Sequence, residues 1–503
     1  MAPAALGAML DAACRNHAAS LAVDDGPESL TYAVLSERAQ AVADQLSTAG
    51  ATADEPVVVV VCNRGVDFAA FLGVWRAGCV AVPSHQSAPP AVLAALIERA
   101  GARFVLDGGG MRSTGRAAPP ARAVLRGAAF VIFTSGSTGL PKGAVISHRA
   151  LCGKLLANDG YLHFGPETRT LLALQITFSF GIWVSLLTLA RGGSLYAMEK
   201  FDPGQALALI EAHAIERVAF VPTMLRAILA FTERESGRSA EVGEGSSLRL
   251  LMTGGESLGA PLGERVRALF ATATLVDIYG LTETATSDFV LRGDDLVTYA
   301  GCIGRPAPGV EFRIMADAQR EAGQGESGEL QIRTPYAMSG YLDADELTRA
   351  AFAEGYFRTG DLARLRADNV VELVGRAKEI ISRGGNKVAP LEVEQVLLGH
   401  PGVAEALVSG VPDARLGERI HALIVARPGI ATSGEVLRRW AAERMEKYKL
   451  PDVWHFGTDL PLGRTGKVDR GRLKELILAG TLSGLRANGE CHGKKTGGSF
   501  DLS

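Results

Sequence analysis

The chain has 503 residues, of which 47% are hydrophobic and 21% charged, a composition ordinary for a globular protein. Its net charge of −3 supplies no overall positive field, so we expect neither a nucleic-acid-binding protein nor one held on an anionic membrane. The length is enough for about three domains and a large buried core.

The six cysteines are scattered without any C-x-x-C spacing, which argues against a disulfide framework or a zinc ribbon. Reduced thiols are the simpler interpretation, and they favour a cytoplasmic protein. Residues 1–12 contain no basic leader, so we expect no signal peptide. The longest apolar runs, at 57–62 and 180–190, are too short to span a bilayer.

Strand and helix patterns alternate through the first half of the chain. The valine-rich run at 57–62 is typical of a buried strand, 66–78 has helical periodicity, and 80–83 is a second short strand. The alternation returns at 171–174, 205–213, 218–221 and 250–252. Such alternation predicts layered, parallel α/β sheets.

Between these elements, residues 107–121 are rich in glycine, alanine and proline and predict one mobile loop. From about Gly301 onward, short alternating segments with many glycines predict antiparallel strands and hairpins. These segments lie at 310–314, 328–332 and 370–373.

The charged, glycine-containing segment 376–387 separates two regions of different pattern, and we place a domain boundary at 375/376. Residues 376–482 then form a small α+β domain, and 483–503 a disordered tail. The small domain is predicted to run helix, strand, strand, helix, at 390–398, 403–411, 421–426 and 434–445.

A segment rich in hydroxyls and glycine follows the apolar, strand-like run at 130–133. It reads Thr134-Ser135-Gly136-Ser137-Thr138-Gly139, and Lys142 comes shortly after it. Glycines let the backbone approach an anion closely, and successive N–H groups can surround one, so the segment predicts a polyphosphate-binding loop. It is not a Walker A loop, because Pro141 precedes the lysine and Gly143 follows it. A flexible Ser/Gly linker is disfavoured, because linkers rarely emerge from an apolar strand.

Segment 133–143 resembles the signature loop of the adenylate-forming superfamily, which includes acyl- and aryl-CoA synthetases, adenylation domains of peptide synthetases and beetle luciferases. Four later segments resemble its second and third ATP motifs, its hinge and its C-terminal lysine motif, in the expected order. They are YGLTE at 279–283, YFRTGDL at 356–362, GRAKE at 375–379 and PLGRTGK at 461–467. The resemblance covers residues 20–475. It implies a large N-terminal domain of layered α/β sheets with a β-rich subdomain, followed by a small mobile α+β domain.

The resemblance implies that ATP and Mg²⁺ bind to residues of these motifs. Thr134, Ser135, Thr138 and Lys142 would hold the β- and γ-phosphates, within a loop completed by Gly136, Ser137 and Gly139. Further nucleotide contacts would come from Gly254, Gly255, Glu256, Ile278, Tyr279 and Gly280, with Tyr279 stacked on adenine. Thr282 would contact the α-phosphate, and the Glu283 carboxylate would bind Mg²⁺, a hard cation. Asp361 and Arg376 would contact the ribose.

Lys467 has the largest expected chemical effect. When a carboxylate attacks the α-phosphate, two anions come together and negative charge builds on the reacting phosphorus. A cation placed between them stabilises this state more than the ground state. The resemblance therefore implies that Lys467, with Thr282 and Glu283, is catalytic.

The superfamily couples adenylation to transfer onto a thiol by turning its small domain about a hinge. Lys378 matches the hinge position. Gly385 matches a glycine that lines the pantetheine tunnel, where a side chain would obstruct the thiol.

Segment 177–183 matches the first substrate-pocket motif. Phe178 falls at a gating aromatic, and Ser179 falls where amino-acid-activating domains carry an aspartate. A serine cannot offset a buried ammonium, so an ordinary α-amino acid is disfavoured. The predicted pocket is mostly apolar and suits an acyl or aryl acid of modest size. It comprises Phe178, Ser179, Phe180, Trp183, Ala219, Met252, Gly254, Ile278, Thr286 and Ser287; several of these, Met252 and Ile278 above all, could equally be core.

CoA is the expected acceptor, because segment 385–394 resembles CoA ligases more than peptide-synthetase domains. The first alternative is a stand-alone enzyme that loads an acyl group or an unusual amino acid onto a separate acyl carrier protein in natural-product biosynthesis. The second is a silent binding protein with this fold, which the presence of Lys467, Thr282, Glu283 and Asp361 argues against.

Overall fold

The computed structural model describes residues 6–108, 110–134, 141–236, 246–427, 429–430, 432–463 and 468–480. The chain forms two compact units. The N-terminal unit comprises Met1–Arg313, Gln331–Thr359 and Asp368–Val371, and the C-terminal unit comprises Ile314–Leu330, Gly360–Ala367 and Glu372–Ser503. The chain therefore crosses between the units several times. The three-part division at 375/376 and 482/483 stays a prediction, and 483–503 lie outside the described residues.

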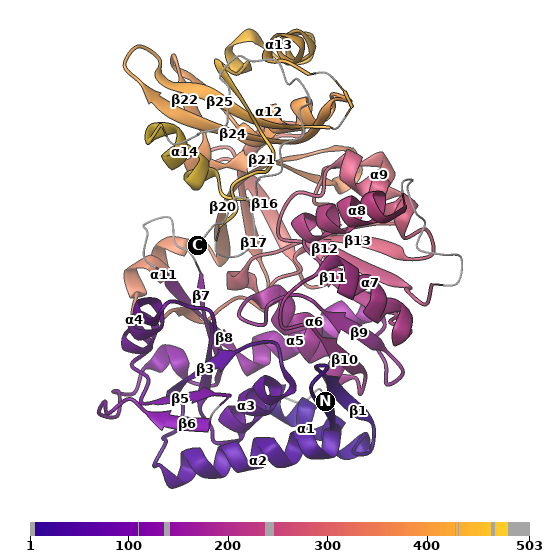
Figure 1. Ribbon diagram of the computed structural model, residues 1–503. Coiled ribbons are helices and arrows are strands. Elements are labelled where there is room, and N and C mark those ends of the chain that lie inside the picture. Colours follow the sequence, from indigo (N-terminus) through magenta and orange to yellow (C-terminus); the bar gives the residue numbers. More distant parts are fainter. Residues whose placement is uncertain are drawn as a thin grey trace. The chain divides into compact units, whose positions relative to one another are not determined.

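The described part of the N-terminal unit contains a nine-stranded sheet of order β15-β14-β13-β12-β11-β9-β10-β1-β2 (Figure 1). Its central strands, from β13 to β1, are parallel, as their alternation with helices predicts. The strands are β1 (Leu21–Asp24), β2 (Ser29–Thr31), β9 (Arg169–Leu172), β10 (Ser194–Ala197), β11 (Arg217–Phe220), β12 (Leu250–Gly254), β13 (Thr274–Tyr279), β14 (Phe289–Arg292) and β15 (Arg305–Pro306).

A seven-stranded sheet of order β18-β8-β7-β4-β3-β5-β6 is parallel from β7 to β5. Its strands are β3 (Pro56–Val61), β4 (Val80–His85), β5 (Phe104–Asp107), β6 (Gly110–Ser113), β7 (Ala128–Thr134), β8 (Lys142–Ser147) and β18 (Gly340–Tyr341). Strand β6 corrects the prediction of one loop over 107–121. It pairs antiparallel with β5, because an edge strand can recruit a segment of weak strand propensity.

Helices pack against both sheets, and α5 and α6 contribute to the largest buried apolar cluster. That cluster joins the two sheets through residues such as Phe130 of β7, Trp183 of α6 and Met252 of β12. The helices of this unit are α1 (Leu6–Asn16), α2 (Tyr32–Thr48), α3 (Gly65–Arg76), α4 (Pro90–Ala100), α5 (His148–Leu162), α6 (Ser179–Ala190), α7 (Pro203–Ala212), α8 (Pro222–Ser236), α9 (Ala260–Leu269), α10 (Asp295–Thr298) and α11 (Asp345–Ala351), with 3-10 turns η1 (Ala123–Leu125) and η2 (Thr282–Thr284).

Local sequence signals explain where several helices begin and end. Helix α7 starts after Asp202, whose carboxylate accepts a hydrogen bond from the Gln205 N–H at 2.8 Å, with proline in the first turn. Helix α5 starts after Ser147, whose hydroxyl accepts from the Ala150 N–H. Helix α4 ends at Gly101, which has a φ of +67° that favours glycine.

A smaller sheet has the order β16-β17-β20-β19, with β21 on β20, and the division between the units falls within its strands. Its strands are β16 (Glu311–Met315), β17 (Ser327–Arg333), β19 (Phe352–Ala353), β20 (Tyr356–Leu365) and β21 (Val371–Arg376), with η3 (Ala367–Asn369) before β21. This sheet is the β-rich region that the segments after Gly301 predicted.

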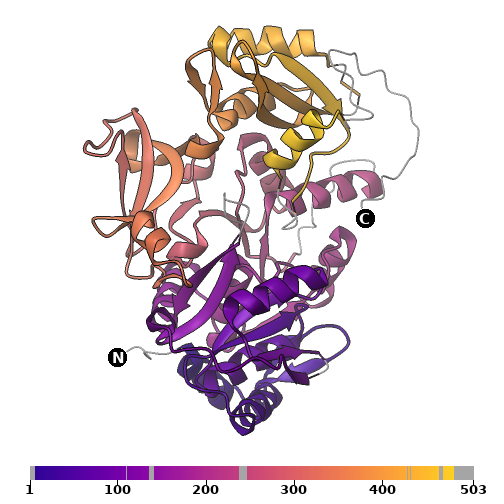
Figure 2. The same ribbon diagram turned by 90° about the vertical axis from the view of Figure 1, so that its left-hand side faces the viewer.

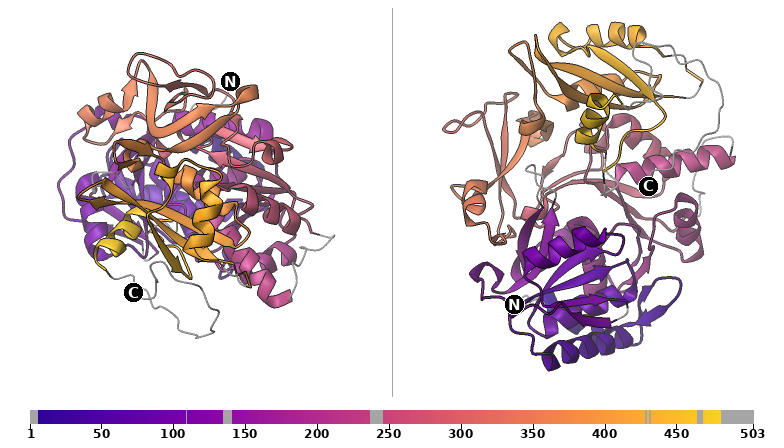
Figure 3. Two further views of the ribbon diagram at one scale, coloured as in Figure 1. Left: turned by 90° about the horizontal axis from the view of Figure 1, so that it is seen from above. Right: turned by 60° about the vertical axis from the view of Figure 1, so that its left-hand side comes forward.

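The rest of the C-terminal unit is one sheet with helices on both faces, and Figures 2 and 3 show it from further sides. Helices α12 and α13 pack on one face through Val393 and Leu437, and α14 packs on the other through Leu473. The predicted helix, strand, strand, helix order is confirmed. The elements are β22 (Ile381–Arg383), β23 (Asn386–Val388), β24 (Val403–Asp413), β25 (Gly417–Ala426), β26 (Val453–Gly457), α12 (Pro390–Leu398), α13 (Gly434–Ala442), α14 (Arg470–Leu478), η4 (Ala377–Glu379) and η5 (Lys447–Lys449).

Two stacked histidines lie side by side on β25 and β26 of this sheet. His421 Nδ1 lies 3.0 Å from His455 Nε2, and the ring centroids are 5.2 Å apart. Burial, together with the neighbouring His455, lowers the pKa of His421 to about 4, and burial lowers the pKa of His455. Both rings are therefore neutral in the folded unit at neutral pH.

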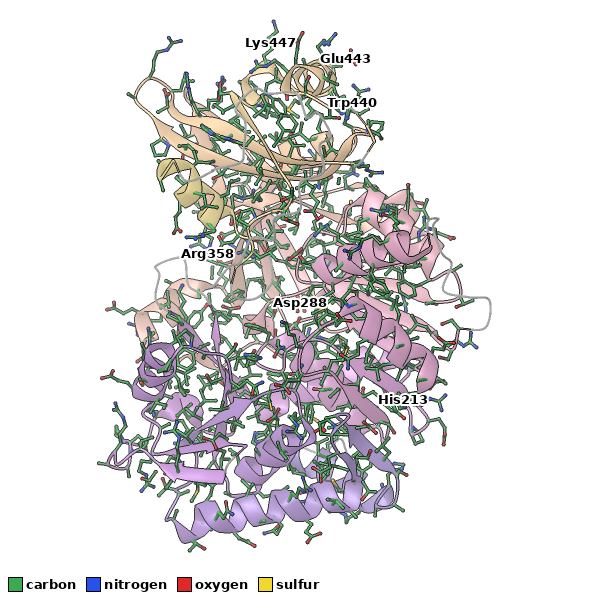
Figure 4. The ribbon with its side chains drawn as sticks, viewed as in Figure 1. His213, Asp288, Arg358, Trp440, Glu443 and Lys447 are labelled. Carbon is green, nitrogen blue, oxygen red and sulfur yellow. The ribbon has the colours of Figure 1, made fainter. Side chains whose placement is uncertain are left out.

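Acid should destabilise the C-terminal unit through this pair. Unfolded histidines take up protons near pH 6.5, whereas folded His421 resists until about pH 4. The free energy of unfolding is therefore at its full value above the unfolded pKa. It decreases as the pH falls from the unfolded pKa to the folded one, by up to about 1.4 kcal/mol per pH unit for each proton. Hydrogen exchange of β25 peptides, corrected for intrinsic rates, measures the loss. His421→Gln should flatten this pH profile. His213→Gln, which changes the residue just after α7 in the other unit (Figure 4), should not, and equal profiles in the two variants would contradict the assignment.

Candidate active site

The predicted phosphate loop connects two paired strands of the seven-stranded sheet. Thr134, at the end of β7, is the cross-strand partner of Lys142, at the start of β8, and the Thr134 hydroxyl lies 3.5 Å from the Lys142 carbonyl oxygen. A strand follows the loop where a Walker A loop would open a helix, which agrees with the sequence argument. The rest of the predicted loop (Ser135, Gly136, Ser137, Thr138 and Gly139) lies outside the described residues.

Tyr341 connects this loop to the second ATP motif. The Lys142 ammonium lies 5.5 Å from the centroid of the Tyr341 ring, and the Tyr341 hydroxyl donates a 2.9 Å hydrogen bond to Glu283 Oε1. Tyr341 is 5% exposed. Burial, and then the charge of Glu283, raises the Tyr341 pKa far above its ordinary value, so the hydroxyl stays a donor throughout the working pH range.

The second ATP motif leaves β13 in a tight turn. A Cβ on Gly280 would lie 2.2 Å from the Ser287 backbone nitrogen, so only glycine fits there. Gly254 is constrained in the same way, because its Cβ would lie 2.2 Å from the Ile278 carbonyl oxygen on the neighbouring strand. Gly255 has a φ of +84°, a left-handed conformation. The predicted nucleotide-binding glycines thus also have structural reasons to be glycine.

The Tyr279 ring, at the end of β13, stacks edge-on with Phe289 at 5.9 Å. The predicted nucleotide contact Glu256 has a carboxylate engaged by Thr223 at 3.1 Å and by Arg226 at 3.5 Å. Its side chain is held at the start of α8, so any contact with a nucleotide competes with these partners.

The segment after Glu283 is held by a buried ion pair that the sequence did not indicate. Lys154 on α5 lies 3.0 Å from Asp288, and both side chains are essentially inaccessible to solvent (Figure 4 labels Asp288). The Lys154 ammonium also donates to the Ser287 carbonyl oxygen at 3.2 Å, and Asp288 accepts from the Thr284 hydroxyl. Three consecutive residues, 285–287, have positive φ, a strained conformation that these contacts hold in place.

The predicted acid pocket begins at the first residue of α6. The Ser179 hydroxyl lies 3.2 Å from the Thr282 hydroxyl, which joins the pocket to the predicted α-phosphate contact. Phe178, just before the helix, is 38% exposed. The rings of Phe180 and Trp183 stack at 5.7 Å.

Several other predicted pocket residues lie deep in the hydrophobic core. Trp183, Ala219, Met252 and Ile278 are all at most 4% exposed and belong to the main apolar cluster. Thr286 and Ser287 are buried as well, and the Ser287 hydroxyl contacts the Tyr161 hydroxyl at 2.8 Å. Burial agrees with a core role for Met252 and Ile278, and their part in a pocket stays a prediction.

In the C-terminal unit, the two predicted ribose contacts pair with each other. Asp361 on β20, 3% exposed, lies 3.0 Å from Arg376 at the end of β21. Lys378, on the 3-10 turn η4, is exposed. Gly384 and Gly385 form the turn of the β22–β23 hairpin, with φ values of +56° and +84°.

Lys467 lies outside the described residues, but the structure describes the strand pair and the helix beside it. Leu462 pairs with Val468, and α14 begins at Arg470. The partly buried Arg470 guanidinium lies 3.0 Å from Glu379 of the hinge and forms a second ion pair with Glu394 on α12. The start of α14, which follows the lysine motif in the chain, is therefore tied to the hinge segment within one unit.

The predicted metal site has a donor set that suits Mg²⁺ better than a transition metal. No group of three or more His, Cys, Asp or Glu side chains that could hold a metal ion occurs in the part of the chain that the structure describes. One oxygen of the Glu283 carboxylate accepts from Tyr341. A single carboxylate, completed by phosphate oxygens and water, is how Mg²⁺ commonly binds beside ATP. The residues present fit Mg·ATP.

Sequence reasoning missed Tyr341, Lys154, Asp288 and Arg470. Tyr341 lies on a two-residue strand, too short to show periodicity. The partners of the other three are distant in sequence, and nothing local marks them.

Comparison with known proteins identifies the family. The family model described as "AMP-binding enzyme" matches residues 10–118 and 111–342 of this chain. A second family model, "AMP-binding enzyme C-terminal domain", matches residues 392–467. A feruloyl-CoA synthase of Amycolatopsis sp is 31% identical, with 90% of this chain and 95% of the relative covered. A fatty acid–[acyl-carrier-protein] ligase, ScoC, of Streptomyces coeruleorubidus is 29% identical over 89% of this chain and 91% of the relative.

A solved structure agrees. ATP-bound MatB from Rhodopseudomonas palustris superposes with a TM-score of 0.80 and 27% identity, covering 94% of this chain and 99% of that one. In the described ranges, every helix is too short or too polar to cross a membrane. With its five ordered motifs, its two-unit α/β fold and these matches, the chain belongs to the AMP-binding enzyme family, the adenylate-forming superfamily that its motifs resemble.

Proposed function

We propose that this protein activates a carboxylic acid with ATP, releases pyrophosphate, and transfers the acyl group from the acyl-adenylate to the thiol of CoA. One observation carries the proposal: contacts run without a break from the phosphate loop to the acid pocket. Lys142 contacts Tyr341, Tyr341 contacts Glu283, and the neighbouring Thr282 contacts Ser179.

This continuity suits attack of a carboxylate on an α-phosphate. The acid's carboxylate oxygen forms a bond to the α-phosphorus, the bond to the β-phosphate bridging oxygen breaks, and pyrophosphate leaves. Lys142 neutralises the leaving charge, Thr282 orients the α-phosphate beside Ser179, and Lys467 offsets the charge that develops between the two anions. Mg²⁺ on Glu283 would neutralise phosphate charge. The thiol then attacks the acyl carbon and AMP leaves.

The acid is an acyl or aryl carboxylic acid without an α-ammonium. Support comes from Ser179, which contacts a neutral hydroxyl and carries no charge, and from the apolar character of Phe180 and Trp183 beside it. Among the relatives, one is named for feruloyl-CoA and one for fatty acids, and both acids fit this description.

Pyrophosphate exchange across a panel of acids tests the activation step. The panel includes ferulic acid, fatty acids of several lengths, and α- and β-amino acids. We expect exchange with aryl or fatty acids and little with α-amino acids. Strong exchange with an α-amino acid would overturn the interpretation of Ser179, and no exchange with any acid would count against the activity itself.

CoA is the proposed acceptor, and a separate acyl carrier protein is the second candidate, favoured by the likeness to an acyl-carrier-protein ligase. Mass spectrometry of the product, with CoA and holo-carrier protein supplied in parallel, separates them. Acyl-CoA alone supports the first candidate, and acyl-carrier protein alone supports the second.

Replacing Gly385 by leucine should spare adenylation and impair thioester formation. In the hairpin turn a Cβ on Gly385 meets nothing within 4 Å, so the leucine would project outward, where it would obstruct a thiol arm. Backbone strain is the competing explanation for a loss of activity, because the φ of Gly385 is +84°, a conformation that leucine rarely adopts. Pyrophosphate exchange and thioester formation are measured separately.

The neighbouring glycine gives a matched control. Gly384 has a φ of +56°, and its Cβ would make only an ordinary contact with Leu416, so Gly384→Leu adds similar strain in the same turn. It should keep both half-reactions. Equal loss of thioester formation in the two variants, or equal loss of both half-reactions in Gly385→Leu, would remove the tunnel assignment.

A further inference from the structure

Tyr341 contacts two groups that the proposed function assigns to Mg·ATP, and it contacts them through different parts of one side chain. Its hydroxyl donates to Glu283 Oε1 at 2.9 Å. Its ring face lies 5.5 Å from the Lys142 ammonium. The two groups come from different sheets of the N-terminal unit: Lys142 begins β8, and Glu283 follows β13.

The backbone of Tyr341 is fixed independently of these contacts. Strand β18 pairs antiparallel with β8, which places Tyr341 opposite Ala144. The Tyr341 N–H donates to the Thr348 hydroxyl at 2.9 Å. With a side chain only 5% exposed, Tyr341 can adopt few other rotamers. It is a rigid part of the sheet that also carries one side of the phosphate loop.

The backbone of Glu283 is also held in place. Its own carbonyl oxygen accepts from the Met338 N–H at 2.7 Å, so the backbone of the second ATP motif is tied to the segment that leads into β18. The tyrosine hydroxyl then satisfies one carboxylate oxygen and fixes its orientation. A carboxylate that is already oriented binds a metal more tightly, because it loses less conformational freedom when the metal binds.

We propose that Tyr341 is a positioning residue for Mg·ATP: its hydroxyl orients the Glu283 carboxylate toward the metal, and its ring holds the Lys142 ammonium at the base of the phosphate loop. This inference rests on the proposed function, because Glu283 and Lys142 matter only where Mg·ATP binds. Tyr341 acts through these two side chains and touches no reacting atom.

The two parts of the side chain can be tested separately. Tyr341→Phe keeps the ring over Lys142 and removes only the hydroxyl, whereas Tyr341→Leu removes both. Binding of ATP is measured by calorimetry without any acid substrate, once with Mg²⁺ and once with EDTA. The readout is an affinity, so it does not depend on turnover.

We expect Tyr341→Phe to weaken Mg·ATP binding by about tenfold, as for the loss of one hydrogen bond to a charged group. It should leave the affinity for metal-free ATP unchanged, because the hydroxyl acts through Glu283. Tyr341→Leu should weaken both affinities, because Lys142 contacts phosphate with or without the metal. In a Glu283→Gln background, Tyr341→Phe should have no further effect on Mg·ATP binding.

A distant tyrosine provides the control for general loosening. Tyr32 is fully buried, and its hydroxyl lies 2.7 Å from the Gly193 carbonyl oxygen and 2.9 Å from that of Leu189. It contacts none of the predicted site residues through this hydroxyl. Tyr32→Phe should lower the melting temperature at least as much as Tyr341→Phe and leave Mg·ATP affinity unchanged.

Three results would overturn the inference. They are an unchanged Mg·ATP affinity in Tyr341→Phe, an equal loss with and without Mg²⁺, and an additive loss in the Glu283→Gln background. If the wild-type protein itself bound no Mg·ATP, the proposed function would fail, and the inference with it. Wild-type binding of Mg·ATP with an unaffected Tyr341→Phe variant would reject the inference alone.

Discussion

Replacing Lys467 by alanine is expected to abolish acyl-adenylate formation while the protein stays folded. The ammonium offsets charge that develops only as carboxylate and α-phosphate combine, so its loss raises the barrier far more than it weakens ground-state binding. Contacts of this kind contribute about 3 kcal/mol or more, which corresponds to a rate loss on the order of a hundredfold or greater. Pyrophosphate exchange with the best acid of the panel measures it.

A control variant and separate measurement of the two half-reactions show whether the effect of Lys467→Ala is specific to adenylation. Lys447, an exposed lysine on η5 of the same unit (Figure 4), gives the matched variant Lys447→Ala, which should keep full exchange. Thioester formation from a chemically prepared acyl-adenylate should survive in Lys467→Ala, because the thiol attacks the acyl carbon and not the phosphorus. Near-wild-type exchange in Lys467→Ala would reject its role.

The largest effect on stability is expected from Lys154→Met. The variant leaves the Asp288 carboxylate, which is inaccessible to solvent, without the ammonium that lies 3.0 Å away. Breaking a buried pair by removing one partner typically costs about 3–5 kcal/mol, because the remaining charge is buried and uncompensated. Hydrogen exchange of α5 and β13 peptides at increasing urea concentration measures the loss in the N-terminal unit.

The loss of stability in Lys154→Met, called the deficit below, should depend on pH in a way that identifies its cause. Burial already raises the pKa of Asp288, and Lys154 opposes that shift, so its removal raises the pKa further. A folded acid with a raised pKa binds its proton more tightly than the unfolded chain does, so stability falls as pH rises through that range. The deficit in Lys154→Met should therefore shrink as the pH falls from 7 toward 4.

The double variant Lys154→Met, Asp288→Asn is the matched control. A neutral amide still accepts a hydrogen bond from Thr284 and carries no buried charge, so much of the lost stability should return. A deficit in the single variant below about 1 kcal/mol, or a double variant no more stable than the single one, would show that the pair is not the main support of this segment.

Residues with a local chemical signature could be predicted from the sequence. The phosphate loop was visible because hydroxyls, glycines and a lysine lie within a few residues after an apolar strand, and the structure places Thr134 and Lys142 as cross-strand partners at its base. The alternation of strands and helices, and the small C-terminal α+β unit, follow from hydrophobic periodicity, which is also local. The prediction of a single loop over 107–121 was wrong in part, because the pairing of β6 with β5 depends on an available strand edge.

The acid pocket could be predicted only in outline. Ser179 stands where an aspartate would pair with a substrate ammonium, so the sequence indicates an acid without that ammonium. The structure adds the contact between the Ser179 and Thr282 hydroxyls. Whether Met252 and Ile278 line a pocket or fill the core could not be read from sequence, because an apolar side chain suits both. Both are at most 4% exposed within the main core.

The sequence by itself determined the family, the order of the motifs and the chemistry that they imply, because each motif is a short run whose side chains act together. Only the tertiary structure decided which distant side chains support them. The contacts of Tyr341 with Glu283 and Lys142, of Lys154 with Asp288, and of Arg470 with Glu379 join residues far apart in the chain. Such contacts depend on strand register and on which face a side chain occupies. A shift of one residue reverses that face, and no local pattern specifies it.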